Sequence, residues 1–153
     1  MKRLFNTNFN NETVHGMLLF LRLAFAAMML THGIPKLQGL MEGGEIKFGD
    51  PIGIGIAPSF YLAIFAEVGC SVLLILGLGT RLALIPLIIT MVVAAFIVHA
   101  PDDFGTKEMA LHYLAVFVFL LFTGPGKYSI DSLIGRNSGR SSGRRRSSRS
   151  RSI

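Results

Sequence analysis

Residues 59–99 read SFYLAIFAEVGCSVLLILGLGTRLALIPLIITMVVAAFIVH, and this stretch decides the fold. It contains two apolar runs, residues 59–78 and 81–99, and each is close to the roughly 20 residues that a helix needs to cross a bilayer. Gly77 and Gly79 lie at the junction, where glycines end helices and permit a tight turn. The stretch therefore predicts two membrane-spanning helices joined as an antiparallel hairpin.

Two further apolar runs lie on either side of this hairpin. They cover residues 14–35 and residues 107–123, and the second run is followed by the sequence GPG at 124–126, which stops a helix. Together the four runs predict an all-α fold, a membrane-spanning four-helix bundle over residues 16–134. A polar N-terminal segment, residues 1–15, precedes the bundle.

The composition agrees with a membrane protein once the basic C-terminal tail is set apart. The chain has 153 residues, of which 51% are hydrophobic and 16% are charged, and its mean hydropathy is +0.55. Soluble domains carry about 25% charged residues, so this chain is too apolar to be soluble by default. Residues 136–153 hold seven arginines and no acid, and removing this +7 from the net charge of +6 leaves −1 for residues 1–135. We expect a nearly neutral bundle with a disordered Arg/Ser-rich tail over residues 135–153.

Loop charges predict the orientation, because cytoplasmic loops carry an excess of Lys and Arg. If the N-terminus is inside, the cytoplasmic side holds eleven basic residues and the outer side holds three, Lys36, Lys47 and Lys107. Both termini are then cytoplasmic, and the loops over residues 38–57 and 100–106 face outward. No small-residue cleavage site closes the first apolar run, so we expect a retained helix rather than a cleaved signal peptide.

Two charged residues lie in the predicted spans away from the span ends, Arg22 in the first and Glu67 near the middle of the second. A charge at the centre of a membrane helix costs about 2.5–3.5 kcal/mol on insertion scales, so such residues usually face the bundle and have a partner. One interpretation is a buried Arg22–Glu67 ion pair, because antiparallel packing would bring the two helices together at similar depth. The alternative is an Arg22 that reaches toward the interface and a protonated, hydrogen-bonded Glu67.

Histidines mark the predicted outer ends of the helices. His32 ends the first span, His99 ends the third, and His112 lies in the first turns of the fourth, with Lys36 and Tyr113 at the same level. One hypothesis is an outward-facing polar pocket in which these residues and the carboxylate of the second span bind a quinone headgroup or another polar ligand. The alternative is that the histidines lie where water returns at the membrane surface.

The sequence predicts neither a metal site nor a haem. No two histidines have the i, i+3 or i, i+4 spacing that places two ligands on one helix. Cys70 is the single cysteine, which excludes an internal disulfide and a Cys-x-x-Cys redox pair. A small buried hydrophobe is the better description of this cysteine.

Short blocks around these polar residues resemble the DoxX family. In order, the blocks are LRL at 21–23, THGIPK at 31–36, AEVG at 66–69, LGLGTR at 76–81, the histidine at 99 and GPGKYSID at 124–131. The combination of blocks and spacings over residues 16–134 makes the resemblance specific. The residues that match the polar pattern of the family are Arg22, His32, Lys36, Glu67, Arg81 and His99.

The resemblance implies a multi-pass protein of the bacterial inner membrane. Some members of the family are associated with redox chemistry, as small subunits of thiosulfate:quinone oxidoreductase or as membrane partners in oxidative-stress complexes. For this chain it implies at most a non-catalytic or quinone-binding subunit, to which a redox partner subunit supplies electrons. We predict that Glu67 and His99 handle protons. The residues predicted to bind the ligand are Arg22, His32, Lys36, Arg81, His112 and Tyr113.

Two other functions fit the sequence. The chain could be a non-enzymatic scaffold that anchors a partner protein, in which case the polar residues hold the helices together. Transport of a small solute is disfavoured, because four short helices without a visible inverted repeat form a poor transporter unless the chain forms a homo-oligomer. The tail is expected to bind anionic membrane lipid, and it has no folded module or aromatic residues for specific nucleic-acid binding.

Overall fold

The computed structural model describes residues 10–136, and within that range it contains helices and no strands. Four spans in the described range are long and apolar enough to cross a membrane: Asn11–Met41, Ile56–Leu76, Thr80–Val98 and Phe104–Thr123. This confirms the predicted all-α four-helix membrane protein. The orientation of the termini stays a prediction, and the tail beyond residue 136, with its predicted disorder and lipid binding, lies outside the described residues.

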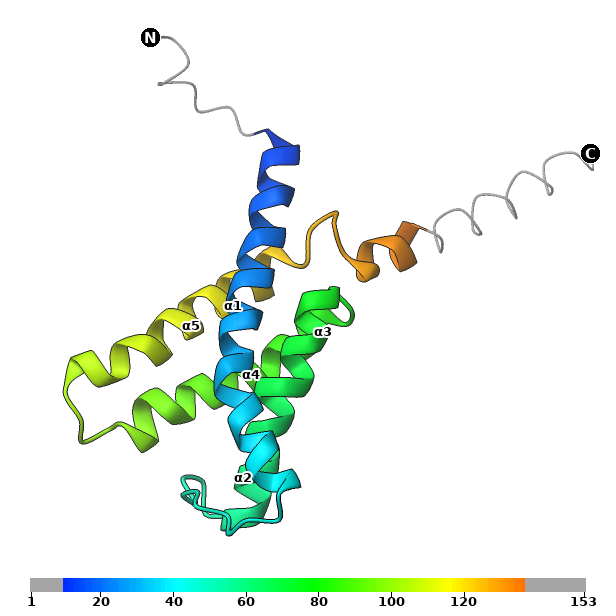
Figure 1. Cartoon of the computed structure of the whole chain (residues 1–153). Coiled ribbons are helices and arrows are strands. Elements are labelled where there is room, and N and C mark those ends of the chain that lie inside the picture. The colour runs from blue at the N-terminus through cyan, green and yellow to red at the C-terminus, as the bar shows by residue number, and fades with distance from the viewer. Residues whose placement is uncertain (1–9, 137–153) are drawn as a thin grey trace, which may run out of the picture.

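Figure 1 shows how the spans are arranged. The first span is α1, and the second span returns alongside it in the opposite direction. The third and fourth spans lie side by side as a second hairpin, which crosses α1 at an angle. Following the chain, the elements are α1 (Asn11–Met41), α2 (Ile56–Ile64), η1 (Phe65–Cys70), α3 (Ser71–Leu76), α4 (Thr80–Val93), η2 (Ala94–Val98) and α5 (Phe104–Thr123).

Helix α1 is longer than the sequence predicted. It begins where the side chain of Asn10 accepts a hydrogen bond from the backbone N–H of Glu12 at 3.0 Å, and it continues through Pro35 to Met41. The prediction that the helix ends at residue 35 is therefore wrong. Membrane helices tolerate an internal proline, because neighbouring groups re-satisfy the freed backbone. The extra length carries Lys36 within a continuous helix. The other three spans begin and end within three residues of the predicted positions.

Two spans contain a short π-helical segment, η1 in the second and η2 in the third. Such segments are rare and frequently occur at functional sites, because the wider turn re-aims side chains. Glu67 lies within η1, and His99 caps the end of η2. Nothing in the sequence pattern predicted these segments.

The buried residues of α1 recur three or four positions apart and so form one face of the helix. These residues are Leu18, Arg22, Ala26, Met29 and Gly33. They pack with buried side chains of the other spans, which include Leu74, Leu84, Leu87, Phe117 and Leu120. Cys70 is 1% exposed and belongs to this core, as expected for a small hydrophobe. Large apolar side chains cover the outside, among them Phe20, Leu82 and Phe122, as a lipid-facing surface requires.

The turn between the second and third spans needs glycine at Gly77. The backbone there has a φ of +67°, and a Cβ would lie 2.6 Å from the Cβ of Ser129 and 2.7 Å from Nη1 of Arg22. An L side chain would therefore be strained in conformation and would have no room. The predicted tight hairpin is confirmed, and its turn packs against the segment that follows α5.

Asp131 caps α4 from a distant part of the chain. Its carboxylate accepts hydrogen bonds from the backbone N–H groups of Gly79 at 2.7 Å and Thr80 at 2.9 Å. Helix α4 has no side-chain cap from its own N-cap residue, so Asp131 supplies the acceptor that the helix start needs. Burial alone would raise the pKa of Asp131, but the N–H groups of Thr80 and Gly79 stabilise the charged form and hold the pKa below its ordinary value.

The variant Asp131→Asn is expected to lower the free energy of unfolding by about 1 kcal/mol at neutral pH, because the two carboxylate oxygens accept from two different N–H groups and an amide has only one acceptor oxygen. A carboxylate with a lowered pKa stabilises the folded state above its unfolded pKa, and this stability is lost as the pH falls through the folded pKa. The difference in unfolding free energy between wild type and variant should therefore disappear as the pH falls below 3.8, the ordinary pKa of an aspartate. Thermal unfolding in detergent micelles at neutral and acidic pH measures the gap.

Glu108→Gln is the matched control, because Glu108 is an exposed carboxylate on α5. This variant should unfold at the same temperature as the wild type at both pH values. A gap for Asp131→Asn that stays the same in acid would show that the charge of Asp131 does not contribute to the cap.

Candidate functional site

A partly buried ion pair joins the first and second spans. Nζ of Lys36 lies 2.5 Å from Oε1 of Glu67, and the two side chains are 29% and 5% exposed. The close approach of α1 and η1 depends on Gly33, because a Cβ there would lie 2.6 Å from Cγ2 of Val68 and 2.9 Å from Cβ of Glu67. The partner of Glu67 is therefore Lys36, and the predicted Arg22–Glu67 pair is wrong. Lys36 pairs with Glu67 because α1 continues past Pro35.

Two cavities meet at this ion pair. The larger has a volume of about 440 Å³ and is mostly apolar. The smaller has a volume of about 320 Å³ and a more polar lining. Both are lined by Lys36, Glu67, Ala94 and His99, so the polar groups lie at their junction. Cavities of this size and mostly apolar lining are typical of sites for small organic ligands.

The smaller cavity brings together five of the eight residues that the sequence predicted. They are His32, Lys36, Glu67, His99 and Tyr113. The ring of Tyr113 is 4% exposed and packs edge-on against Phe25, at 5.7 Å between ring centroids, and against His32, at 6.0 Å. The structure brings these residues together around one cavity although α1 continues past His32 to Met41 and Tyr113 lies in the middle of α5. Their chemical roles stay predictions.

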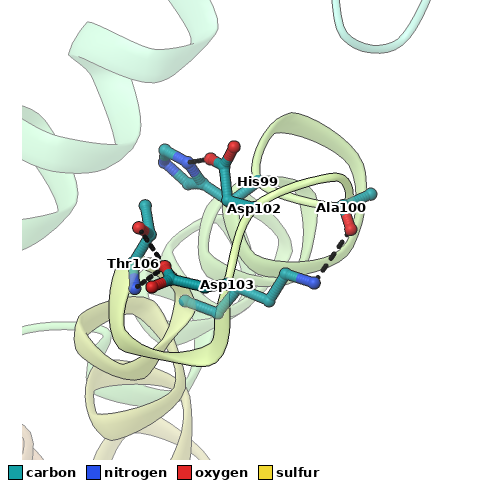
Figure 2. Close-up of polar contacts among 6 residues, drawn as sticks. His99, Ala100, Asp102, Asp103 and Thr106 are labelled. Carbon is teal, nitrogen blue, oxygen red and sulfur yellow. Dashed lines mark hydrogen bonds and ion pairs between the residues drawn. The ribbon is translucent and has the colours of Figure 1, made fainter.

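His99 is held by the turn between the third and fourth spans (Figure 2). Its Nδ1 lies 2.7 Å from Oδ2 of Asp102, and a carboxylate in that position holds the proton on Nδ1. The next residue, Asp103, caps α5 by accepting hydrogen bonds from the hydroxyl of Thr106 at 2.8 Å and its N–H at 3.2 Å. The Thr106 hydroxyl and then its N–H lower the pKa of Asp103. Both aspartates thus fix the turn that presents His99.

The loop over residues 42–55 covers the larger cavity. Phe48, Pro51 and Ile52 line it, and Nζ of Lys36 lies 5.5 Å from the centroid of the Phe48 ring, within the range of a cation–π contact. Asp50 ties the loop to α2 by accepting hydrogen bonds from Gly55 N–H at 2.9 Å, Ile54 N–H at 3.0 Å and the Ser59 hydroxyl at 2.9 Å.

The sequence did not predict that this loop forms a wall of the site. The N–H of Gly55 is the largest cause that lowers the pKa of Asp50. These bonds reach four and five residues along the chain, beyond the two residues of an Asx turn, so no local turn signal predicted them. The position of Phe48 over Lys36 had no signal in the sequence.

Three predicted ligand-binding residues lie elsewhere. Arg22 is 1% exposed and donates to the backbone carbonyls of Pro125 and Tyr128, both at 2.7 Å, at the opposite end of α1 from Lys36. Arg81 is exposed beside Gly124 at that same end. His112 is exposed on α5 and lines a shallow groove apart from the ion pair. Distance along the bundle therefore separates Arg22 and Arg81 from the two joined cavities.

Within residues 10–136, no group of three or more His, Cys, Asp or Glu side chains is arranged to hold a metal ion. The charged groups at the junction are one carboxylate and one ammonium, which already pair with each other. The donor set of the site is therefore suited to hydrogen-bonding an organic ligand.

Comparison with known proteins places this arrangement in a family. The DoxX family model matches residues 17–100, a range that contains Lys36, Glu67 and His99. An uncharacterized protein of Haemophilus influenzae is 33% identical over 125 residues, which are 75% of this chain and 88% of that protein. An uncharacterized membrane protein of Mycobacterium tuberculosis is 35% identical over 126 residues, 72% of this chain and 77% of that protein.

A second uncharacterized protein of Haemophilus influenzae is 29% identical over 124 residues, which cover 76% of this chain and 82% of that protein. No solved structure matches. The resemblance that the sequence blocks indicated is thus confirmed by an independent match, over the three spans that carry the ion pair and His99.

Proposed function

Because this chain belongs to the DoxX family of membrane proteins, we propose that it is a subunit of a quinone-linked redox system in the bacterial inner membrane. The ion pair of Lys36 and Glu67 at the junction of an apolar and a polar cavity carries the proposal. Both termini are proposed to be cytoplasmic, which places the two cavities toward the outer face.

The described residues fit a quinone-type ligand. Such a ligand has a flat polar head and an apolar tail, and the two cavities offer a polar and an apolar compartment that share one wall. Several lipid-exposed side chains line the larger cavity, including Leu62, Phe65, Ile89 and Val98. A tail in that cavity would reach the lipid directly.

The residues of the junction can orient such a head and hold its protons. Lys36 has N–H groups beyond the one that faces Glu67 and can donate to a ring oxygen. His99, with Nδ1 bonded to Asp102, has an imidazole ring that suits proton exchange with water at the membrane surface. Electrons would come from a partner subunit, so the chain itself binds the ligand and is not the complete enzyme.

A larger side chain at the wall that the two cavities share would occupy the proposed binding space, and this tests the proposed function. Ala94 lines both cavities, so Ala94→Leu puts three additional carbon atoms where the head is proposed to lie. We expect the wild type purified in mild detergent to retain quinone, measured as total oxidised and reduced quinone per chain by solvent extraction. The variant should retain about tenfold less, equivalent to ~1.4 kcal/mol of binding free energy.

Ala115→Leu is the matched control, because Ala115 is exposed on α5 and lies outside both cavities. It makes the same substitution on the lipid-facing surface and should retain quinone at the wild-type level. Wild-type protein that carries no quinone and is not stabilised by added quinone would contradict the proposal and would favour a non-enzymatic scaffold.

A further inference from the structure

The second carboxylate oxygen of Glu67 has no hydrogen-bond partner among the described residues. Oε1 faces Nζ of Lys36 at 2.5 Å, whereas Oε2 is fully buried and unpaired. Glu67 is 4% exposed and lines both cavities. In the ion pair the carboxylate of Glu67 accepts from the ammonium of Lys36, and a carboxylate only accepts hydrogen bonds. The junction therefore presents a buried acceptor that lacks a donor.

His99 offers a second acceptor at the same junction. Its Nδ1 is bonded to Oδ2 of Asp102 at 2.7 Å (Figure 2), and Nδ1 carries the proton because the carboxylate accepts. In the neutral ring Nε2 then has a lone pair. His99 lines both cavities together with Glu67. The site therefore has two acceptor atoms, Oε2 of Glu67 and Nε2 of His99, that receive no hydrogen bond from the described residues.

From this imbalance we propose that the site binds the reduced, hydroxylated form of its ligand, a hydroquinone with an apolar tail, more tightly than the oxidised quinone. A quinone oxygen only accepts hydrogen bonds, so it would face Oε2 lone pair to lone pair. A phenolic hydroxyl both accepts and donates. It accepts from Lys36 and donates to Oε2 of Glu67 at once, which satisfies the unpaired oxygen. The inference rests on the proposed function and specifies the ligand of that site.

The experiment compares the affinity of the full-length protein for the two forms of one ligand. The protein is placed in nanodiscs stripped of native quinone, and the probes are a decyl-tailed benzoquinone and its hydroquinone, kept reduced under argon. Equilibrium dialysis should give at least a roughly tenfold tighter Kd for the hydroquinone. Equal affinities, or a tighter Kd for the quinone, would overturn the inference and leave the proposed function standing. Failure of both forms to bind would overturn both.

Glu67→Gln tests the assigned oxygen. The amide –NH2 can donate to a quinone carbonyl, so the preference for the hydroquinone should vanish or reverse. The matched control Glu108→Gln changes an exposed carboxylate on α5 and should keep the wild-type ratio of affinities. A Glu67→Gln protein with the wild-type ratio would refute the role of this carboxylate.

If Glu67→Gln does not fold, the binding of two further probes to the wild-type protein still tests the inference. The probes are 4-decylphenol and its methyl ether, which have the same shape at the ring and no redox chemistry. The phenol can donate a hydrogen bond and the ether cannot, so the phenol should bind roughly tenfold more tightly. Equal binding of the two would overturn the inference.

Discussion

Arg22→Ala is expected to cost about 2–6 kcal/mol of unfolding free energy, because two carbonyl groups each lose a charged donor at about 1–3 kcal/mol per group. The guanidinium is 1% exposed and donates to the carbonyls of Pro125 and Tyr128, at 2.7 Å each. Alanine would remove the donor from both carbonyls and would open a cavity beside Gly77. Loss of this contact would free the segment after α5, and that segment also contains Asp131, the residue that caps α4.

The measurement is the midpoint of thermal or SDS-induced unfolding in detergent micelles. Arg81→Ala is the control, because it removes an exposed guanidinium from the same end of the bundle and should change the stability by less than about 0.5 kcal/mol. Arg22→Lys should fall between wild type and Arg22→Ala, since one ammonium cannot reproduce the planar fork on two carbonyls. An Arg22→Ala protein as stable as the Arg81→Ala control would contradict the role assigned to Arg22.

Gly33→Ala is expected to destabilise the protein by about 1–3 kcal/mol, the usual cost of overpacking a filled contact. The new Cβ would lie 2.6 Å from Cγ2 of Val68, 2.9 Å from Cβ of Glu67 and 3.1 Å from its carbonyl carbon. Two of these atoms belong to Glu67, so α1 and η1 must separate. The separation should also pull Lys36 from Glu67 and reduce quinone retention.

Gly16→Ala is the matched control on the same helix, because no other atom lies within 4 Å of its Cβ position. A glycine in an open helix position is expected to gain up to about 1 kcal/mol when it becomes alanine, so the two variants should shift stability in opposite directions. Unfolding midpoints and extracted quinone per chain give both readouts. A Gly33→Ala protein that is stabilised and retains quinone would show that α1 and η1 do not need this close contact.

The spans could be predicted from local sequence because the bilayer acts on each segment separately. Each helix must satisfy its own backbone in the lipid and be long enough to cross it, so length and apolar composition are sufficient signals. The turn at Gly77 and Gly79 was also local, and both glycines have positive φ. The extension of α1 past Pro35 was missed because tertiary neighbours compensate for a proline in a way that local rules do not include.

The sequence predicted most of the polar residues that line the smaller cavity, but it did not predict which cation pairs with Glu67. The sequence grouped His32, His99 and Tyr113 by their expected places near helix ends, and the structure does place them with Lys36 and Glu67 around one cavity. The grouping holds although α1 continues past His32 and Tyr113 lies in the middle of α5. Which cation meets Glu67 depends on how α1 and η1 are rotated and how closely they approach at Gly33. Those are relations between helices, and a charge count along the chain contains no information on them.

The sequence by itself determined that this is a four-span membrane protein of the DoxX family with a few charges inside the bundle. Only the tertiary structure decided that Arg22 binds the backbone after α5, that Lys36 pairs with Glu67, and that Oε2 of Glu67 is left without a donor. The physical reason is that hydrophobic insertion follows the composition of each segment, whereas a buried charge is satisfied only by the partner that packing brings within hydrogen-bond distance.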